Sequence, residues 1–174
     1  HAYARGLEPT ACEDLRLISV WNPTFLILLL APLNEWWDSL LNDLANGTIT
    51  PPAPLEESLR QSLLKKFLRT TQYATRLSRI SPDDYISIWP HLRLLSCWAD
   101  GASANYARDL QERFPTIIIQ PKGLLATEAF VSFPLVGYEG GALAVTSHYF
   151  EFLTDCGDIF LAHQLEKGKT YSVV

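Results

Sequence analysis

The sequence contains no methionine, and His1 stands at its first position. This absence indicates that the 174 residues are a fragment of a longer gene product. The beginning of the chain also lacks a charged segment followed by an apolar one, so no secretory leader is recognisable. The longest apolar run, residues 25–33, is interrupted by Pro32 and falls well short of the roughly 20 residues that span a membrane. We therefore expect no membrane partner.

Cysteines and basic residues are also scarce. Cys12, Cys97 and Cys156 form no CxxC pair, and an odd number of cysteines favours reduced thiols over a disulfide framework. Because no His or Cys lies at ligand spacing from another, a zinc site is not expected. The formal net charge is -5 and the 14 basic residues cluster only modestly, which argues against a nucleic-acid surface. These features predict a cytoplasmic protein, and they leave its oligomeric state open.

Apolar residues make up 48% of the chain, enough to build a core. The run 15–21, with β-branched residues, predicts a buried strand. Asn22 and Pro23 then predict a helix start, because Asn caps and Pro suits the first helical position. Residues 25–30 are apolar on all sides, so we expect this helix to be fully buried. Pro32 should kink the helix or restart it.

Two amphipathic helices are expected next. Leucines and tryptophans at spacings of three and four over 33–44 predict one helix face, which should end at Gly47. The proline-rich segment 50–54 predicts a stiff connecting loop. Leucines and a phenylalanine roughly in phase over 55–77 predict a second helix.

The second half predicts a βαβ unit. Residues 92–98 read as a strand, 103–114 as a helix and 116–119 as another strand, an order that usually gives adjacent parallel strands. Further strands are expected at 143–145 and 149–153. The fold class is therefore α/β, with a mostly parallel sheet and flanking helices.

Two turns are candidate binding sites, since ligands of open α/β sheets bind beyond the carboxyl ends of strands. In the turn 98–103, Gly101 and Ala102 would let a flat ligand approach the backbone, although a tight strand-to-helix turn needs small residues anyway. In the second turn, 123–129, which opens with Gly123, the Thr127 hydroxyl can donate to a phosphate and the Glu128 carboxylate can hold Mg²⁺. A Thr-Glu pair is common, so an ordinary turn is the alternative reading.

Two further side chains leave alternatives open. His148 has a titration range that suits a general base, but a hydrogen-bonded His in a pocket wall is the favoured interpretation. Lys122 could contact phosphate or simply face solvent.

Five segments in a fixed order carry a resemblance. They are 17–25 (LISVWNPTF), 89–90 (WP) with 97–101 (CWADG), 124–128 (LLATE), 147–152 (SHYFEF) and 166–174 (EKGKTYSVV). Together they resemble the Gretchen Hagen family of acyl-acid-amido synthetases, a branch of the adenylate-forming superfamily. The resemblance runs over nearly the whole chain. It implies an ATP- and Mg²⁺-dependent ligase that adenylates a small carboxylic acid and passes the acyl group to an amine or amino acid.

The resemblance also implies roles for single residues. Thr127 would contact the α-phosphate and Glu128 would hold the Mg²⁺. The turn formed by Asp100, Gly101 and Ala102 would border the adenine and acyl pocket. The acyl substrate would lie near the side chains of Trp98, Phe130, Val131, His148 and Tyr149. Plant members tend to have Ser-Ser-Glu where this chain has Ala-Thr-Glu, which keeps a hydroxyl and the carboxylate.

The resemblance further implies that 1–174 is a partial adenylation domain. Residues 1–80 would be a helix-rich segment with one strand, and 81–174 a βαβ segment that carries the Thr-Glu pair. The family's upstream phosphate loop, its ribose-binding Tyr-Arg-x-Gly-Asp and its C-terminal domain do not occur in these residues. We therefore expect the fragment alone to be inactive. The alternatives are a non-catalytic truncated homologue that acts as a binding or assembly module, and an acyl-CoA synthetase of the same superfamily.

Overall fold

The computed structural model describes residues 12, 14–65, 70–138 and 140–174. The chain forms two compact units, of which the first ends at Pro121 and the second is Lys122–Val174. The expected boundary at residue 80, between a helix-rich segment and a βαβ segment, separates parts by their secondary structure and stays a prediction.

A three-stranded parallel sheet forms the base of the first unit. It contains β1 (Leu17–Ser19), β2 (Leu94–Cys97) and β3 (Ile118–Pro121) in the order β1-β2-β3. In this register Leu17, Leu94 and Ile118 lie side by side across the three strands. The predicted parallel pairing of the two strands of the βαβ unit is therefore confirmed.

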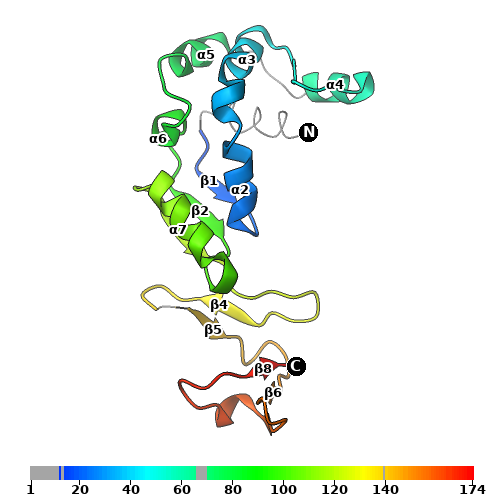
Figure 1. Ribbon diagram of the computed structural model, residues 1–174, viewed down its shortest axis with the longest axis vertical. Helices are drawn as coiled ribbons and strands as arrows, with labels where there is room; N and C mark the ends of the chain where they lie inside the picture. The colour runs from blue at the N-terminus through cyan, green and yellow to red at the C-terminus, as the bar shows by residue number, and fades with distance from the viewer. Residues whose placement is uncertain (1–11, 13, 66–69, 139) are drawn as a thin grey trace. The chain divides into compact units, whose positions relative to one another are not determined.

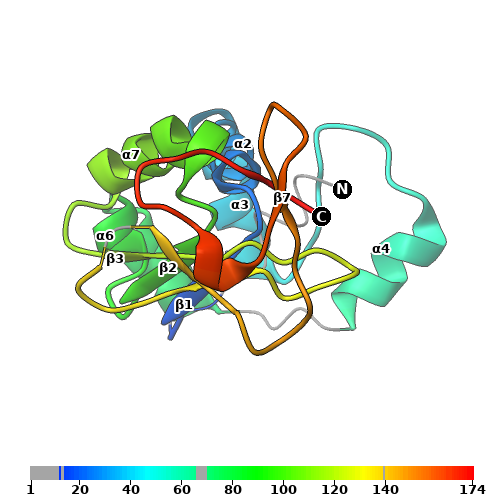
Figure 2. The same ribbon diagram turned by 90° about the horizontal axis from the view of Figure 1, so that it is seen from below.

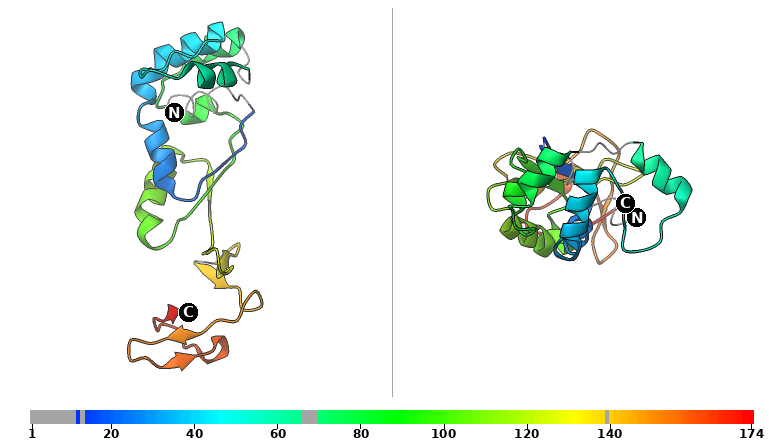
Figure 3. Two further views of the ribbon diagram at one scale, coloured as in Figure 1. Left: turned by 90° about the vertical axis from the view of Figure 1, so that its right-hand side faces the viewer. Right: turned by 90° about the horizontal axis from the view of Figure 1, so that it is seen from above.

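Helices α2 and α7 flank this sheet. After β2, the short 3₁₀ turn η1 (Gly101–Ser103) leads into α7 (Ala104–Arg113). Helix α7 buries Leu110, contacts β3 and packs against α2 (Pro23–Leu30). Figures 2 and 3 show α2 and α7 on the same side of the three strands. The predicted α/β architecture, a parallel sheet with flanking helices, is confirmed.

Helix α2 begins as predicted and is less buried than predicted. The Asn22 side chain accepts a hydrogen bond from the Thr24 backbone N–H and Pro23 occupies the first turn. Only one face is covered, because Leu26 is buried whereas Phe25 is 62% exposed and Leu28 is 68% exposed. The expectation of complete burial was wrong, since an all-apolar sequence does not reveal how many faces meet a neighbour.

Helix α3 (Leu33–Asn46) follows a two-residue break at Pro32, as expected, and ends at Gly47 in the left-handed conformation with φ 70°. Its apolar stripe faces α5 (Thr71–Leu77), and the two helices lie side by side (Figure 1).

The predicted single helix over 55–77 is wrong. The structure contains α4 (Glu57–Leu64) and α5 instead, because Thr70 has a non-helical backbone, with φ -134° and ψ 69°, and stands before α5 as its N-cap. The Thr70 N–H donates to the carbonyl of Leu44, which ties this break to the end of α3. Phe67, one of the residues that suggested continuity, lies outside the described residues.

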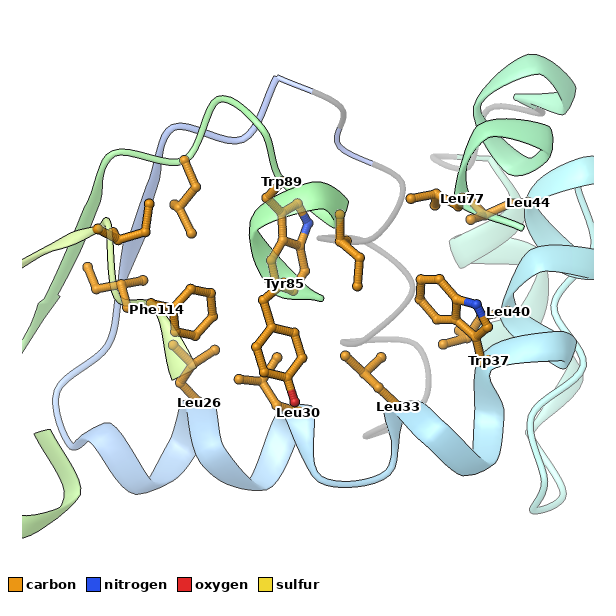
Figure 4. Packing of buried hydrophobic residues seen from close by; sticks show 14 of the residues in the cluster. Leu26, Leu30, Leu33, Trp37, Leu40, Leu44, Leu77, Tyr85, Trp89 and Phe114 are labelled. Atoms are coloured by element: carbon orange, nitrogen blue, oxygen red, sulfur yellow. The ribbon is translucent and has the colours of Figure 1, made fainter. Parts of the chain in front are cut away.

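An aromatic stack joins the layers of the first unit. Tyr85, in the short helix α6 (Tyr85–Ile88), stacks on Phe114 with ring centroids 5.2 Å apart, and Trp89 stacks on both. Figure 4 shows these rings between the leucines of α2 and the chain that follows α6. Leu40 and Leu77 are fully buried in the same core, near α5.

The second unit consists of two small antiparallel sheets, which the sequence did not predict as such. One pairs β4 (Ser132–Pro134) with β5 (Gly141–Leu143). The other has β6 (Phe152–Leu153) between β7 (Ile159–Phe160) and β8 (Ser172–Val173), with the short 3₁₀ turn η2 (Ala162–Gln164) between β7 and β8. A small core consists of Val131, Phe150 and Phe152. The strands expected at 143–145 and 149–153 overlap β5 and β6 only in part.

No helix in the described part of the chain is long and apolar enough to cross a membrane.

Candidate functional site

The first candidate turn follows β2 directly, as predicted. The Trp98 backbone N–H donates to the Trp21 carbonyl at 2.7 Å, which extends the pairing of β1 and β2 by one step. The two indole rings lie tilted with centroids 5.8 Å apart. The Trp98 Nε1 atom is buried and finds no hydrogen-bond partner among the described residues. A buried indole N–H usually has a partner, so this donor is an exception among the described residues, and the atoms around it shield it from solvent.

The backbone of this turn is open to approach. Gly101 has φ +55°, a left-handed conformation that strains any residue with a side chain. A Cβ there would meet no atom within 4 Å, so the glycine is needed for the conformation and the space beside it is empty. Asp100 and Ala102 are exposed on either side, and the Asp100 carbonyl accepts from the Ser103 N–H. The turn can therefore admit a flat group against its backbone.

The second candidate pair lies at the tip of a hairpin in the second unit. Leu125 and Phe130 form an antiparallel bridge, and the Ala126 N–H donates to the Ala129 carbonyl at 3.0 Å. Thr127 and Glu128 are thus the two residues between the closing pair, and both are exposed. Two-residue loops are the shortest hairpin connections, so the backbone holds these side chains within narrow limits.

The Glu128 carboxylate has local hydrogen-bond donors. The hydroxyl of Thr127, and then the backbone N–H of Glu128 itself, lower the pKa of the carboxyl below its ordinary value. The group is fully exposed, so it stays ionised and accessible to a cation.

The Glu128 carboxylate fits Mg²⁺ as one protein ligand among several. The described residues hold no group of three or more His, Cys, Asp and Glu side chains that could bind a metal alone. Proteins commonly hold Mg²⁺ through one or two carboxylates plus substrate phosphates and water. A single exposed carboxylate beside a hydroxyl matches that mode and does not match an all-protein cage.

The predicted acyl-site residues of the second unit surround the same hairpin. Phe130 is 45% exposed on the return strand and Val131 beside it is buried. The Ser147 hydroxyl contacts the Phe130 carbonyl oxygen at 2.6 Å, and His148 Nδ1 lies 3.2 Å from that hydroxyl. Tyr149 is 75% exposed and its hydroxyl donates to Glu151.

The structure therefore gathers the predicted residues in two groups. Trp98, Asp100, Gly101 and Ala102 form one turn of the first unit. Thr127, Glu128, Phe130, Val131, His148 and Tyr149 belong to one connected part of the second unit. Their roles stay predictions.

Sequence reasoning missed Ser132, which helps to hold the hairpin in place. Gly123 and Ser147 lay in segments that the sequence singled out, but their contacts with the hairpin were not predicted. A glycine at 123 was a usable signal, since close backbone approach is one of its ordinary causes. No sequence signal marked Ser132, whose importance depends on a contact eight residues away.

Comparison with known proteins gives a family and a fold. The model of the GH3 family N-terminal domain matches residues 10–119, which include the first candidate turn and end before Thr127. A solved structure described as "GH3.15 acyl acid amido synthetase" matches with a TM-score of 0.83 at 16% identity, over 99% of this chain and 34% of that one. A second, "AtGH3.15 acyl acid amido synthetase in complex with 2,4-DB", matches with a TM-score of 0.81 at 15% identity, over 99% of this chain and 32% of that one. No curated protein matches the chain. The chain thus spans about a third of the length of these solved chains.

Proposed function

Because the chain belongs to the GH3 family, we propose that it is part of the adenylation domain of an ATP-dependent ligase, which joins a small carboxylic acid to an amine such as an amino acid. The observation that carries this proposal is the Thr127–Glu128 pair at an exposed two-residue hairpin tip. The fold likeness to acyl acid amido synthetases supports the reaction class. With a third of the length of those chains, this part alone is expected to be inactive.

The proposed chemistry has two steps. A carboxylate oxygen of the acid attacks the α-phosphorus of ATP, and the bond to pyrophosphate breaks. The amine nitrogen then attacks the activated carbonyl carbon, AMP leaves with the carbon–oxygen bond electrons, and the amine loses a proton. Activation is needed because a carboxylate is a poor electrophile, whereas AMP is a good leaving group.

Thr127 and Glu128 would serve the first step. Glu128 would hold Mg²⁺, which when bound neutralises charge on the departing pyrophosphate. The Thr127 hydroxyl has a single proton, and in this structure it bonds to the Glu128 carboxylate. To reach a phosphate oxygen, the hydroxyl must turn away from the carboxylate. A cation bound to that carboxylate would favour the turn, because it competes for the same oxygens.

The acid would lie against aromatic and apolar side chains. Phe130 and Tyr149 are exposed in the same unit as the hairpin, and His148 Nδ1 lies 3.2 Å from the Ser147 hydroxyl. The complex of one matched structure with 2,4-DB supports a small carboxylic acid as the substrate class. In the first unit, the open backbone at Gly101 is suited to a flat group such as adenine.

We place the protein in the cytoplasm, without a nucleic-acid or membrane partner. ATP is available there, and the exposed thiols of Cys12 and Cys156 suit a reducing compartment.

The test is Glu128→Gln in the full-length protein, measured by ATP–pyrophosphate exchange. The amide keeps the size of the side chain and removes its negative charge. Electrostatic contributions of this kind are worth several kcal/mol, so we expect a loss on the order of 100-fold or more. Glu112→Gln, an exposed carboxylate of α7, is the matched control and should leave the rate unchanged.

A rate within about twofold of the parent, a barrier difference of about 0.4 kcal/mol, would refute the role of Glu128. The same assay separates the alternatives. Exchange with product formed from coenzyme A and none from amines would indicate an acyl-CoA synthetase. No exchange by the folded parent with any acid would indicate a non-catalytic homologue.

A further inference from the structure

The hairpin that carries Thr127 and Glu128 is fastened at its base by an unusually close contact. A Cβ built on Gly123 would lie 1.8 Å from the carbonyl oxygen of Ser132 and 2.6 Å from the Cα of Phe133. Both obstacles are backbone atoms, so no rotamer change could make room. The two chain segments can meet at this distance only because position 123 has no side chain.

Ser132 takes part in the hydrogen bonds at the base of this hairpin. Its Oγ accepts a hydrogen bond from the Leu124 backbone N–H at 2.9 Å. In return, the Leu124 carbonyl accepts from the N–H groups of both Val131 and Ser132, at 3.0 and 3.1 Å. Two residues of one strand thus oppose one residue of the other, which is a β-bulge. Bulges bend a strand and redirect the side chains beyond it, and they are over-represented next to active sites.

A second glycine, Gly141, lies beside the Ser132 side chain. The strand β4 that begins at Ser132 also pairs with β5, where Pro134 is opposite Gly141. A Cβ on Gly141 would lie 2.9 Å from Ser132 Oγ and 3.2 Å from its Cβ. The hydroxyl therefore lies over a space that a larger residue at 141 would fill, and it is directed toward Leu124.

We propose that Ser132 is a positioning residue for the Thr127–Glu128 pair, held between Gly123 and Gly141 so that the hairpin 124–131 keeps one register toward the nucleotide and its Mg²⁺. This inference rests on the proposed function of Glu128. It adds that the ion-binding geometry depends on a hydroxyl that does not touch the ion. The other contacts of the hairpin in the described residues are the bridge, the two bonds to the Leu124 carbonyl, the bond from the Ala144 N–H to the Val131 carbonyl, and the Ser147 contact at Phe130; Val131 also packs in the small core.

The experiment uses four variants of the full-length protein. Ser132→Ala removes the acceptor, and Ser132→Thr keeps the hydroxyl and suits a strand. Gly141→Ala displaces the same hydroxyl without removing it, and it tests the proposal even if Ser132→Ala folds poorly. Ser172→Ala, at an exposed serine of β8 in the same unit, is the matched control.

Two quantities are measured besides the rate of ATP–pyrophosphate exchange. Amide hydrogen exchange, resolved along the chain, should become faster over 124–131 in Ser132→Ala while β6 keeps its protection. Calorimetry should show the affinity for Mg-ATP falling about tenfold, the factor that one lost hydrogen bond of typical strength produces. Ser132→Thr should restore both values to within about twofold, and Gly141→Ala should shift both in the same direction as Ser132→Ala but by less. In the Glu128→Gln background, Ser132→Ala should change the Mg-ATP affinity by a smaller factor than in the parent, since part of its effect acts through that carboxylate.

Three results would overturn the proposal. Unchanged amide hydrogen exchange over 124–131 in Ser132→Ala would show that the hydroxyl does not hold the hairpin. Full affinity for Mg-ATP in Ser132→Ala, with a clear loss in Glu128→Gln, would refute the positioning role and leave the proposed function standing. Unchanged affinity and rate in Glu128→Gln would refute the proposed function, and the role of Ser132 toward the nucleotide would fall with it.

Discussion

Asp43 offers the sharpest test of how the first unit is held together. This residue lies in the last turn of α3 and its side chain is completely buried. Oδ1 accepts from the hydroxyls of Thr48 and Thr50 at 2.6 and 2.8 Å, and Oδ2 accepts from the Thr50 backbone N–H at 2.7 Å. The carboxylate thus fixes the chain as it leaves the helix past Gly47. Asp43→Ala removes all three bonds at once.

The expected cost follows from these contacts. A hydrogen bond to a charged group contributes about 1.5–3 kcal/mol, and a buried donor left without a partner costs about 1–3 kcal/mol. The three bonds share one carboxylate, so their contributions do not simply add. We expect a loss of about 4 kcal/mol in the free energy of unfolding. At about 4 °C per kcal/mol for a unit of this size, Tm should fall by about 16 °C.

The assay is thermal unfolding followed by far-ultraviolet circular dichroism, which reports the helices. Asp38→Ala is the matched control, because Asp38 is an exposed residue of the same helix and should change Tm by less than about 2 °C. Thr50→Val, which removes one hydroxyl and keeps the backbone N–H, should give an intermediate shift. A fall of less than about 4 °C in Asp43→Ala would refute the reasoning, since it would leave about 1 kcal/mol for the whole network.

Two further predictions concern Gly123 and Asp84. Gly123→Ala should lower the free energy of unfolding by about 3 kcal/mol, since its Cβ forces apart the three hydrogen bonds at the base of the hairpin. Gly140→Ala has open space beside it and should lower the free energy of unfolding by only about 1 kcal/mol, because of its left-handed backbone. Equal losses for the two variants in denaturant unfolding would contradict this. Asp84 caps α6 by accepting from Ser87, whose side-chain and then backbone hydrogen bonds lower the pKa of the Asp84 carboxyl. Because that pKa is depressed by folding, the contribution of Asp84 is fully present above about pH 4 and disappears as the pH falls through the folded value. Asp84→Ala should thus lose about 1 kcal/mol at neutral pH and less in acid, as measured by urea unfolding at both; a gap that widens in acid would reverse the assigned sign.

Local signals in the sequence predicted the first unit well. Asn22 and Pro23 start a helix and Gly47 ends one, because capping and a left-handed glycine are properties of single residues. The strands β2 and β3 and the helix between them follow from short-range periodicity. The break at Thr70 was missed because it depends on a hydrogen bond to Leu44, a tertiary contact. The exposed Phe25 and Leu28 were missed for a related reason, since hydrophobicity does not say which neighbours are present.

Only part of the candidate site could be predicted from the sequence. The turn at Gly101 was located correctly, because it follows a recognisable strand directly. The Thr127–Glu128 pair was singled out, but its hairpin was not foreseen, since the strands on either side are short and irregular. The local pattern marked the glycine at 123 but not its partner Ser132. Both residues matter because two backbone segments, eight or nine residues apart in the sequence, approach each other closely. Hydrophobic periodicity carries no information about such a contact.

The strand order β1-β2-β3 has a consequence for the way the first unit assembles. Strands β2 and β3 are separated by η1 and α7, whereas β1 and β2 are separated by every described helix from α2 to α6. Closing the longer connection costs more chain entropy, and that cost precedes the gain from pairing. We therefore expect the β2–α7–β3 segment to form early in folding, and β1 to dock on it once the helices between β1 and β2 have formed. By the same reasoning, we expect the pairing of Leu17–Ser19 with β2 to open before that of β2 with β3.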